Sequence, residues 1–229
     1  MSGTVVLCGS LGATSVMWEP QLPVLDGRTV VEVEHPGHGG APVTEVETVG
    51  DLAARVLAQV GTDTFSFVGL SLGGAVGMRL AIDSPERVEK LVLSCTSARF
   101  GEPEQWRERA ATVRAQGLEL LVDTIMARWF TPAFAAVGAF REMFLSVDPE
   151  GYARCCDALA SWDVRGDLGR IAAPTLVIFA SEDPVTPPAV GELLSSGIAG
   201  ARFEVLEQAA HLANAERPDL FNRLLEEFL

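Results

Sequence analysis

Short apolar runs and longer helical patterns alternate along most of the chain. The apolar runs are rich in β-branched residues and have the length of strands; they cover residues 4–8, 29–34, 64–70, 90–95, 175–180 and 202–207. Stretches with a helical pattern follow at about 49–60, 72–83, 187–197 and 217–228. Parallel neighbouring strands need helical crossovers of this kind, so the pattern predicts a mostly parallel sheet covered by helices on both faces.

The alternation stops between residues 99 and 168. This interval shows no strand pattern, only helix-like segments at 102–116, 117–129 and 149–161, and it contains Trp106, Trp129 and Trp162. An aromatic-rich helical insertion between two strands is expected to form a lid over the carboxyl edge of the sheet, with a plain helical subdomain as the alternative. The predicted organisation is a core domain of residues 1–98 and 169–229 and a helical lid of residues 99–168.

Composition and charge reduce the number of possible functions. Of the 229 residues 48% are hydrophobic and 21% are charged, which suits a packed core. The formal net charge is −14 and no block of Lys or Arg occurs, so a nucleic-acid partner is not expected. An acidic protein also repels anions at long range, and an anionic substrate would therefore need a local cation.

The sequence shows neither a membrane segment nor an export signal. The apolar runs fall well short of the ~20 residues that span a bilayer. The N-terminus lacks the basic region and the long apolar core of a signal peptide. Cys8, Cys95, Cys155 and Cys156 have no metal-ligand spacing and are expected to be reduced thiols, which predicts a cytoplasmic protein without a metal site.

A Gly-x-Ser-x-Gly motif follows the third apolar run directly. It reads Gly69-Leu70-Ser71-Leu72-Gly73, and a helical pattern begins after it. This strand–turn–helix setting is typical of a nucleophile elbow, where glycines permit a sharp turn that strains the serine backbone. The motif predicts Ser71 as the nucleophile and the amide of Leu72 as an oxyanion donor, with a Gly-rich turn that holds an incidental serine as the alternative.

A serine nucleophile needs a base and a group that orients this base. In such sheets the acid precedes the histidine in sequence, and each follows a strand. Asp183 and His211 stand directly after the fifth and sixth apolar runs and are the predicted acid and base. Glu182 is the alternative acid, and His35 and His38, in the Gly/Pro-rich segment after the second run, are the alternative bases.

The second oxyanion donor is expected in the loop after the first strand. This loop reads Cys8-Gly9-Ser10-Leu11-Gly12, and its glycines allow the backbone to turn an amide towards the site. Leu11 is the predicted donor.

Several segments of the chain resemble the 3-oxoadipate enol-lactonases, α/β-hydrolases of aromatic catabolism, and the resemblance covers nearly the whole chain. The matching segments are Ser10-Leu11-Gly12, Met17-Trp18-Glu19-Pro20-Gln21-Leu22, Arg128-Trp129-Phe130-Thr131-Pro132-Ala133-Phe134, Glu150-Gly151-Tyr152-Ala153, Asp183-Pro184 and Ala210-His211-Leu212. The elbow and Pro85-Glu86-Arg87-Val88 are shared with many α/β-hydrolases and are less specific.

The resemblance implies an activity, a fold and a site. The activity is hydrolysis of 3-oxoadipate enol-lactone, a five-membered ring with a carboxymethyl arm, to 3-oxoadipate in the β-ketoadipate pathway, without a cofactor. The fold is the α/β-hydrolase fold, here expected without the N-terminal hairpin that many members have and without a fused decarboxylase domain. The implied site consists of the triad Ser71, Asp183 and His211, the oxyanion donors Leu11 and Leu72, and Trp129 in the pocket.

An arginine of the lid is expected to bind the carboxylate of such a substrate. Arg128 precedes Trp129, but adjacent helical residues diverge by about 100° and are not expected to face one pocket together. Arg154, Arg141 and Arg99 are further candidates, and the sequence does not choose among them. Two rival functions also remain open: a small-molecule carboxylesterase on the same fold, and a non-catalytic ligand-binding protein.

Overall fold

The computed structural model describes residues 3–229. In this part of the chain the strands form one six-stranded sheet in the order β2-β1-β3-β4-β5-β6, and every neighbouring pair is parallel. The strands are β1 (Thr4–Cys8), β2 (Thr29–Val33), β3 (Phe65–Leu70), β4 (Val88–Ser94), β5 (Thr175–Ala180) and β6 (Arg202–Leu206). The predicted parallel sheet is confirmed, with strand ends that differ by two residues at most.

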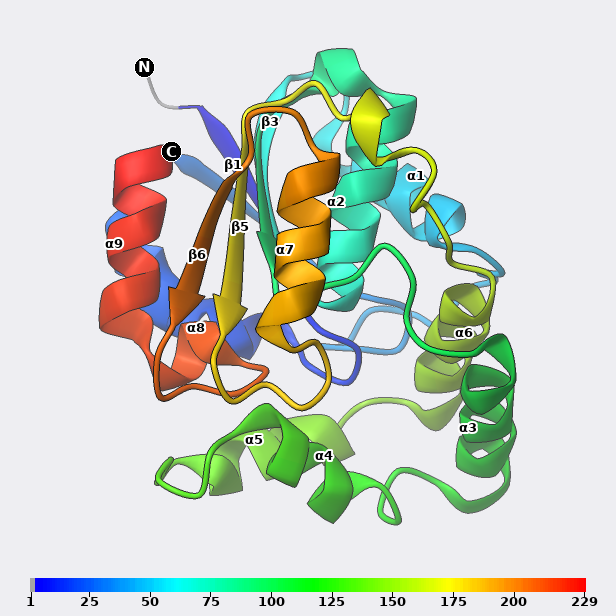
Figure 1. Cartoon of the computed structure of the whole chain (residues 1–229). Coiled ribbons are helices and arrows are strands. Elements are labelled where there is room, and N and C mark those ends of the chain that lie inside the picture. The colour runs from blue at the N-terminus through cyan, green and yellow to red at the C-terminus, as the bar shows by residue number, and fades with distance from the viewer. Residues whose placement is uncertain (1–2) are drawn as a thin grey trace.

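Helices cover both faces of this sheet (Figure 1). The 3₁₀ segment η1 (Ser15–Leu25), α8 (Ala213–Glu216) and α9 (Pro218–Phe228) pack together on one side. On the other side lie α1 (Val49–Val60), α2 (Leu72–Asp83) and α7 (Pro188–Gly197). Because the central strands are covered twice, every residue of β3 and β5 is buried, which explains why these strands read as continuous apolar runs.

The interval between β4 and β5 is helical. It contains α3 (Pro103–Gln116), α4 (Val122–Trp129), α5 (Val137–Leu145) and α6 (Pro149–Ala160). Figure 1 shows α4 and α5 beyond the carboxyl ends of β5 and β6, while α3 and α6 pack against each other at the flank. This is the position expected of a lid, and the division into a core and a lid stays a prediction.

The helices predicted from the sequence differ from those of the structure in several places. The segment 117–129 is not one helix, because Gly117 adopts φ 81° and its amide caps α3 at the Val113 carbonyl, so that α4 begins only at Val122. The segments η1 and α5 were not predicted. In η1 the two prolines, Pro20 and Pro23, interrupt an α-helical pattern and leave 3₁₀ geometry instead.

None of the helices within residues 3–229 has both the length and the apolar character needed to cross a bilayer. The cytoplasmic location stays a prediction.

Candidate active site

Ser71 occupies a strained turn between β3 and α2. Its backbone has φ 58° and ψ −113°, a conformation that costs free energy for any residue with a Cβ. The Ser71 amide donates to the Ser94 carbonyl at 2.9 Å, and the Ser71 carbonyl accepts from the Thr96 hydroxyl at 2.6 Å. The neighbouring strand β4 and the turn after it therefore hold the elbow in its strained form.

The glycines on each side of Ser71 are required by close backbone approaches. A Cβ at Gly69 would lie 2.3 Å from the Gly73 carbonyl oxygen, and a Cβ at Gly73 would lie 2.0 Å from the Cys8 carbonyl oxygen. Backbone atoms cannot move aside as a flexible side chain can, so only glycine fits at either position. The Gly-x-Ser-x-Gly pattern thus has a steric cause in this chain.

Asp183 and His211 form a buried hydrogen-bonded pair. Asp183 follows β5, His211 follows β6, and His211 Nδ1 lies 2.8 Å from Asp183 Oδ2. Asp183 also accepts hydrogen bonds from the amides of Val185 and Thr186 and from the Thr186 hydroxyl. Glu182, the alternative acid, is exposed on the surface instead.

The surroundings of Asp183 favour its ionised form. Burial acts to raise the pKa of this carboxyl, but the His211 ring, the Thr186 hydroxyl and the Val185 amide outweigh burial and hold the pKa below its usual value. A carboxylate fixed in this way can keep the His211 ring in one orientation, with its Nε2 directed away from the acid.

Ser71 and His211 line the same small cavity. Both residues lie in the described part of the chain, and no hydrogen bond joins the Ser71 hydroxyl to the His211 ring. In enzymes without substrate this contact is often long and shortens only in the complex. The structure therefore brings the predicted nucleophile and base into one cavity and joins the base to the predicted acid.

The amides of Leu11 and Leu72 are available for an incoming oxyanion. Within residues 3–229 neither of them donates a hydrogen bond to protein. The next amide along, that of Gly73, is already used, because it donates to the Gly9 carbonyl at 3.0 Å. This bond ties the elbow to the loop after β1, so the two predicted donors belong to segments that are directly joined.

His35 and His38 do not belong to the pair of acid and base. They brace the loop after β1: the His35 Nε2–H donates to the Gly9 carbonyl at 2.9 Å, and His38 Nε2 accepts from the Gly12 amide at 3.0 Å. The His38 ring in turn donates from Nδ1 to the Pro36 carbonyl at 2.8 Å. Sequence analysis missed this supporting role, because it depends on the pairing of β1 with β2 and not on any local motif.

His38 needs to be neutral for these contacts because its Nε2 accepts a hydrogen bond, whereas His35 only donates and is kept neutral by its burial. Burial lowers the pKa of His35 to about 4 and that of His38 to about 3. In the unfolded chain a histidine has a pKa of about 6.5, so the unfolded state binds more protons between these values. Their contribution to stability is present above pH 6.5 and is lost as the pH falls towards 4.

We therefore expect the free energy of unfolding to fall between pH 7 and pH 5. Each of the two histidines should contribute a slope of up to about 1.4 kcal/mol per pH unit below pH 6.5. Urea unfolding at pH 7, 6 and 5 measures this slope, above the range in which most carboxylates titrate. The variant His38→Asn removes one titrating ring and should show about half the slope; an equal slope in both proteins would contradict the assignment.

Two neighbouring cavities lie near Ser71. The inner one is small, about 40 Å³, and lies over the nucleophile; it is lined by Ser10, Leu11, Ser71, Trp106, Arg109, Ile125, Arg128, Trp129, Tyr152, Val185 and His211. The outer one, about 390 Å³, opens towards solvent and shares Trp106, Arg109, Arg128 and Val185 with the inner cavity. The outer cavity, called the vestibule below, therefore lies directly beside the inner one.

The comparisons with known proteins agree with this geometry. The family model described as alpha/beta hydrolase fold matches residues 3–218. The chain belongs to the α/β-hydrolase family. Two relatives from Acinetobacter baylyi, 3-oxoadipate enol-lactonases 2 and 1, are 38% and 32% identical over 97% and 98% of this chain and 86% and 88% of their own lengths. The crystal structure of the enol-lactonase from Burkholderia xenovorans LB400 superimposes with a TM-score of 0.94 at 34% identity, covering 100% of this chain and 91% of that one.

The resemblance to the 3-oxoadipate enol-lactonases is therefore confirmed for this α/β-hydrolase. Trp129, which the resemblance placed in the pocket, lines the inner cavity. The expectation that Arg128 and Trp129 would not face one pocket is wrong. Helix α4 ends at Trp129, and the long side chain of Arg128 reaches the cavity despite its different direction on the helix.

The other three candidate arginines of the hydrolase are engaged at the surface. Arg99 pairs with Glu102, Arg141 pairs with Asp123, and Arg154 pairs with both Glu45 and Glu150. None of the three lines the two cavities described above. Arg109 does line both and was not considered from the sequence, where only its place three residues after Trp106 on a predicted helix was visible.

Helix α4 is anchored to the loop that carries His211. The Leu212 amide donates to the Trp129 carbonyl at 3.0 Å. The Glu216 carboxylate accepts from the amides of Ala210 and Thr131 at 2.9 and 3.0 Å, and so joins the two segments a second time. The wall of the cavity formed by Trp129 and the position of His211 therefore depend on each other.

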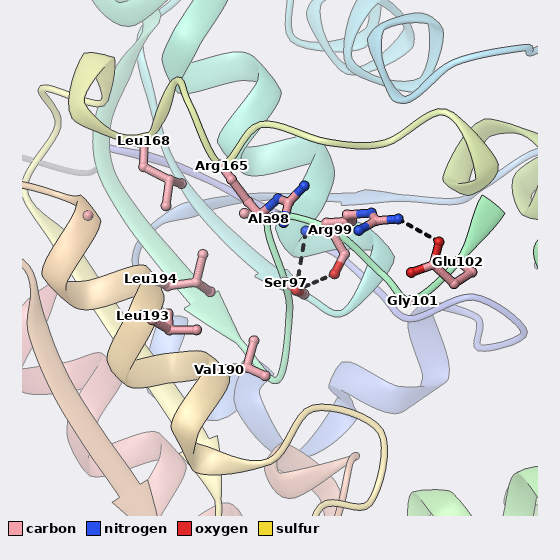
Figure 2. A pocket seen from close by; sticks show the side chains of 11 residues that line it. Ser97, Ala98, Arg99, Gly101, Glu102, Arg165, Leu168, Val190, Leu193 and Leu194 are labelled. Atoms are coloured by element: carbon pink, nitrogen blue, oxygen red, sulfur yellow. Dashed lines mark hydrogen bonds and ion pairs between the residues drawn. The ribbon is translucent and has the colours of Figure 1, made fainter.

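A larger open cleft of this hydrolase lies elsewhere. Figure 2 shows it between α7 and the segment after β4, where Val190, Leu193 and Leu194 form an apolar wall. Its volume is about 470 Å³. Its arginines are occupied, since Arg99 pairs with Glu102 and Arg165 with Asp163. None of the three candidate catalytic side chains lines this cleft, whereas Ser71 and His211 line the smaller cavity.

Cys95, Asp183 and His211 are the one group of possible metal ligands in residues 3–229, with ligand atoms within 4.8 Å of one another. Burial raises the pKa of the Cys95 thiol well above its usual value, which opposes the thiolate form that a metal needs. His211 Nδ1 and Asp183 Oδ2 are also bonded to each other. This donor set fits an oriented histidine better than a metal site.

Proposed function

We propose that this α/β-hydrolase hydrolyses 3-oxoadipate enol-lactone to 3-oxoadipate, with Ser71 as the nucleophile, His211 as the base and Asp183 as the orienting acid. One observation carries the proposal: the strained Ser71 and His211, which is hydrogen-bonded to the buried Asp183, line the same cavity. Hydrolysis of an ester bond agrees with this arrangement, and the enol-lactonase relatives support the lactone as the substrate.

The first half of the reaction opens the ring. His211 takes the proton of the Ser71 hydroxyl while its oxygen attacks the lactone carbonyl, and the amides of Leu11 and Leu72 stabilise the tetrahedral oxyanion. The bond between the carbonyl carbon and the ring oxygen then breaks, and an enolate leaves as a stabilised leaving group. Since the enolate remains part of the same acyl chain, it stays attached to Ser71, accepts the proton held by His211 and becomes a ketone, which leaves His211 neutral again.

The second half releases the product. His211 takes a proton from a water molecule, and the resulting hydroxide attacks the acyl carbon bound to Ser71. Collapse returns the proton from His211 to the Ser71 oxygen and frees a carboxylic acid, which ionises at neutral pH to a carboxylate. Ring opening thus consumes one water and yields a single product with two carboxylates, which a protein of net charge −14 repels at long range.

The main rival is a general carboxylesterase on the same fold. The two functions differ in substrate preference, so the purified protein is offered the enol-lactone and a neutral nitrophenyl ester in parallel. The proposal expects ring opening of the lactone to a product heavier by one water, at a higher kcat/KM than ester hydrolysis. Hydrolysis of the nitrophenyl ester with no conversion of the lactone would assign the esterase function instead.

A further inference from the structure

Two arginines from different helices lie at the neck, the boundary at which the inner cavity and the vestibule adjoin. Arg109 belongs to α3 and Arg128 belongs to α4, and each lines both cavities. Both side chains are half-buried. Two guanidinium-bearing side chains therefore border the space beside Ser71.

The neck is locally basic in an acidic protein. No carboxylate lines either cavity in the part of the chain that the structure describes. Neither Arg109 nor Arg128 forms an ion pair within residues 3–229, whereas Arg107, also on α3, pairs with Glu104, and Arg141, on α5, pairs with Asp123. Two unpaired cations beside a nucleophile are costly to keep close together unless an anion joins them.

Aromatic contacts hold Arg109 in place. Its guanidinium carbon lies 4.7 Å from the centre of the Trp106 ring, a cation–π contact. The Trp106 indole N–H donates to the Phe100 carbonyl, which fixes the ring that Arg109 covers. Burial raises the pKa of the Tyr152 phenol, and the positive charge of Arg109 opposes this effect, which places the guanidinium beside that wall of the inner cavity.

We propose that Arg109 and Arg128 together bind the carboxylate of an anionic substrate arm while the reacting carbonyl lies at Ser71. The proposal rests on the proposed hydrolysis at Ser71 and names what this site selects: esters or lactones whose acyl chain carries a second, charged carboxylate. Planar guanidinium groups suit this role because each can donate two parallel hydrogen bonds to a carboxylate. The arrangement also supplies the local cations that the net charge of the chain makes necessary.

The test compares two esters with the same leaving group: mono-4-nitrophenyl glutarate, which has an anionic arm, and 4-nitrophenyl butyrate, which is neutral. We expect Arg109→Gln and Arg128→Gln each to lower the ratio of their kcat/KM values by about 10- to 100-fold, since a hydrogen bond to a charged group contributes that much. The loss should fall mainly on KM for the anionic ester. Arg128→Lys should restore part of the ratio because it keeps the charge.

Arg107→Gln is the matched control, since Arg107 lies on the same helix as Arg109 but is exposed and paired with Glu104. It should keep the wild-type ratio. A second measurement uses the wild-type protein and so does not depend on the folding of a variant. Glutarate should inhibit hydrolysis of the neutral ester with an inhibition constant at least about 10-fold lower than that of the uncharged glutaramide.

The outcomes separate this proposal from the proposed function. Equal ratios in the wild type and both glutamine variants, or equal inhibition by glutarate and glutaramide, would overturn the arginine site even if the enol-lactone is hydrolysed. An arginine-dependent preference for the anionic ester in a protein that does not open the enol-lactone would support the arginine site and refute the lactone as the substrate.

Discussion

Replacement of Ser71 by alanine is expected to lower kcat for ester and lactone hydrolysis by about 10⁶-fold, the loss typical of a serine nucleophile. The strained turn, the two oxyanion amides and the Asp183–His211 pair would remain, but no atom would form the acyl bond. The rest of the site leaves a residual rate of about 10³–10⁴ over water. Steady-state kinetics with a nitrophenyl ester measures the change.

Covalent labelling provides an independent reading of the same substitution. A fluorophosphonate should add one group per chain to the wild-type protein and none to Ser71→Ala, as seen by intact mass. Ser196→Ala is the control, because the Ser196 hydroxyl is exposed on α7 and bonds only to the Leu193 carbonyl. Full activity or full labelling of Ser71→Ala would show that another group is the nucleophile.

Replacement of Asp183 by asparagine is expected to lower kcat by about 10⁴-fold with little change in the fold. The Asp183 carboxylate accepts a hydrogen bond from the Nδ1–H of His211 at 2.8 Å and so leaves Nε2 free to act as a base. An asparagine amide can donate to Nδ1 instead, which moves the ring proton to Nε2, the wrong nitrogen for accepting the Ser71 proton.

Glu182→Gln is the natural comparison for this variant. Glu182 is the neighbouring acid and is exposed, so its substitution should leave kcat within about a factor of two, as is usual for surface positions away from the chemistry. Thermal unfolding of both variants checks that Asp183→Asn keeps its fold, since the Val185 and Thr186 amides also bond to this side chain. A large loss of kcat in Glu182→Gln, together with an active Asp183→Asn, would show that Glu182 and not Asp183 is the orienting acid.

The parts of this fold that sequence analysis predicted well are those with a local physical cause. Strands β3 and β5 are continuous apolar runs because both faces of the sheet are covered. The elbow is visible because Gly69 and Gly73 have no room for a Cβ, so that a three-dimensional constraint appears as a short motif. Asp183 and His211 could be predicted as acid and base because each of them directly follows a predicted strand, in the expected order along the chain.

The parts that sequence analysis missed depend on contacts between distant segments. Arg109 and Arg128 line one cavity only because α3 and α4 both lie beside it. The helical pattern of each segment does not predict how the two helices are placed in space. The support that His38 gives to Gly12 arises from segments 26 positions apart. In the case of Arg128 the reasoning from helical geometry failed because the helix ends one residue later and its side chain is long.

The most direct test of the proposed activity is the loss of ultraviolet absorbance of the enol-lactone when purified wild-type protein is added, measured beside hydrolysis of 4-nitrophenyl butyrate. The lactone signal disappears in the ultraviolet, whereas nitrophenolate released from the ester appears at a longer wavelength, so both rates can be measured with the same enzyme stock. The account predicts rapid loss of the lactone signal, absent in Ser71→Ala, with a kcat/KM above that for the neutral ester. An unchanged lactone signal while the ester is hydrolysed would contradict it.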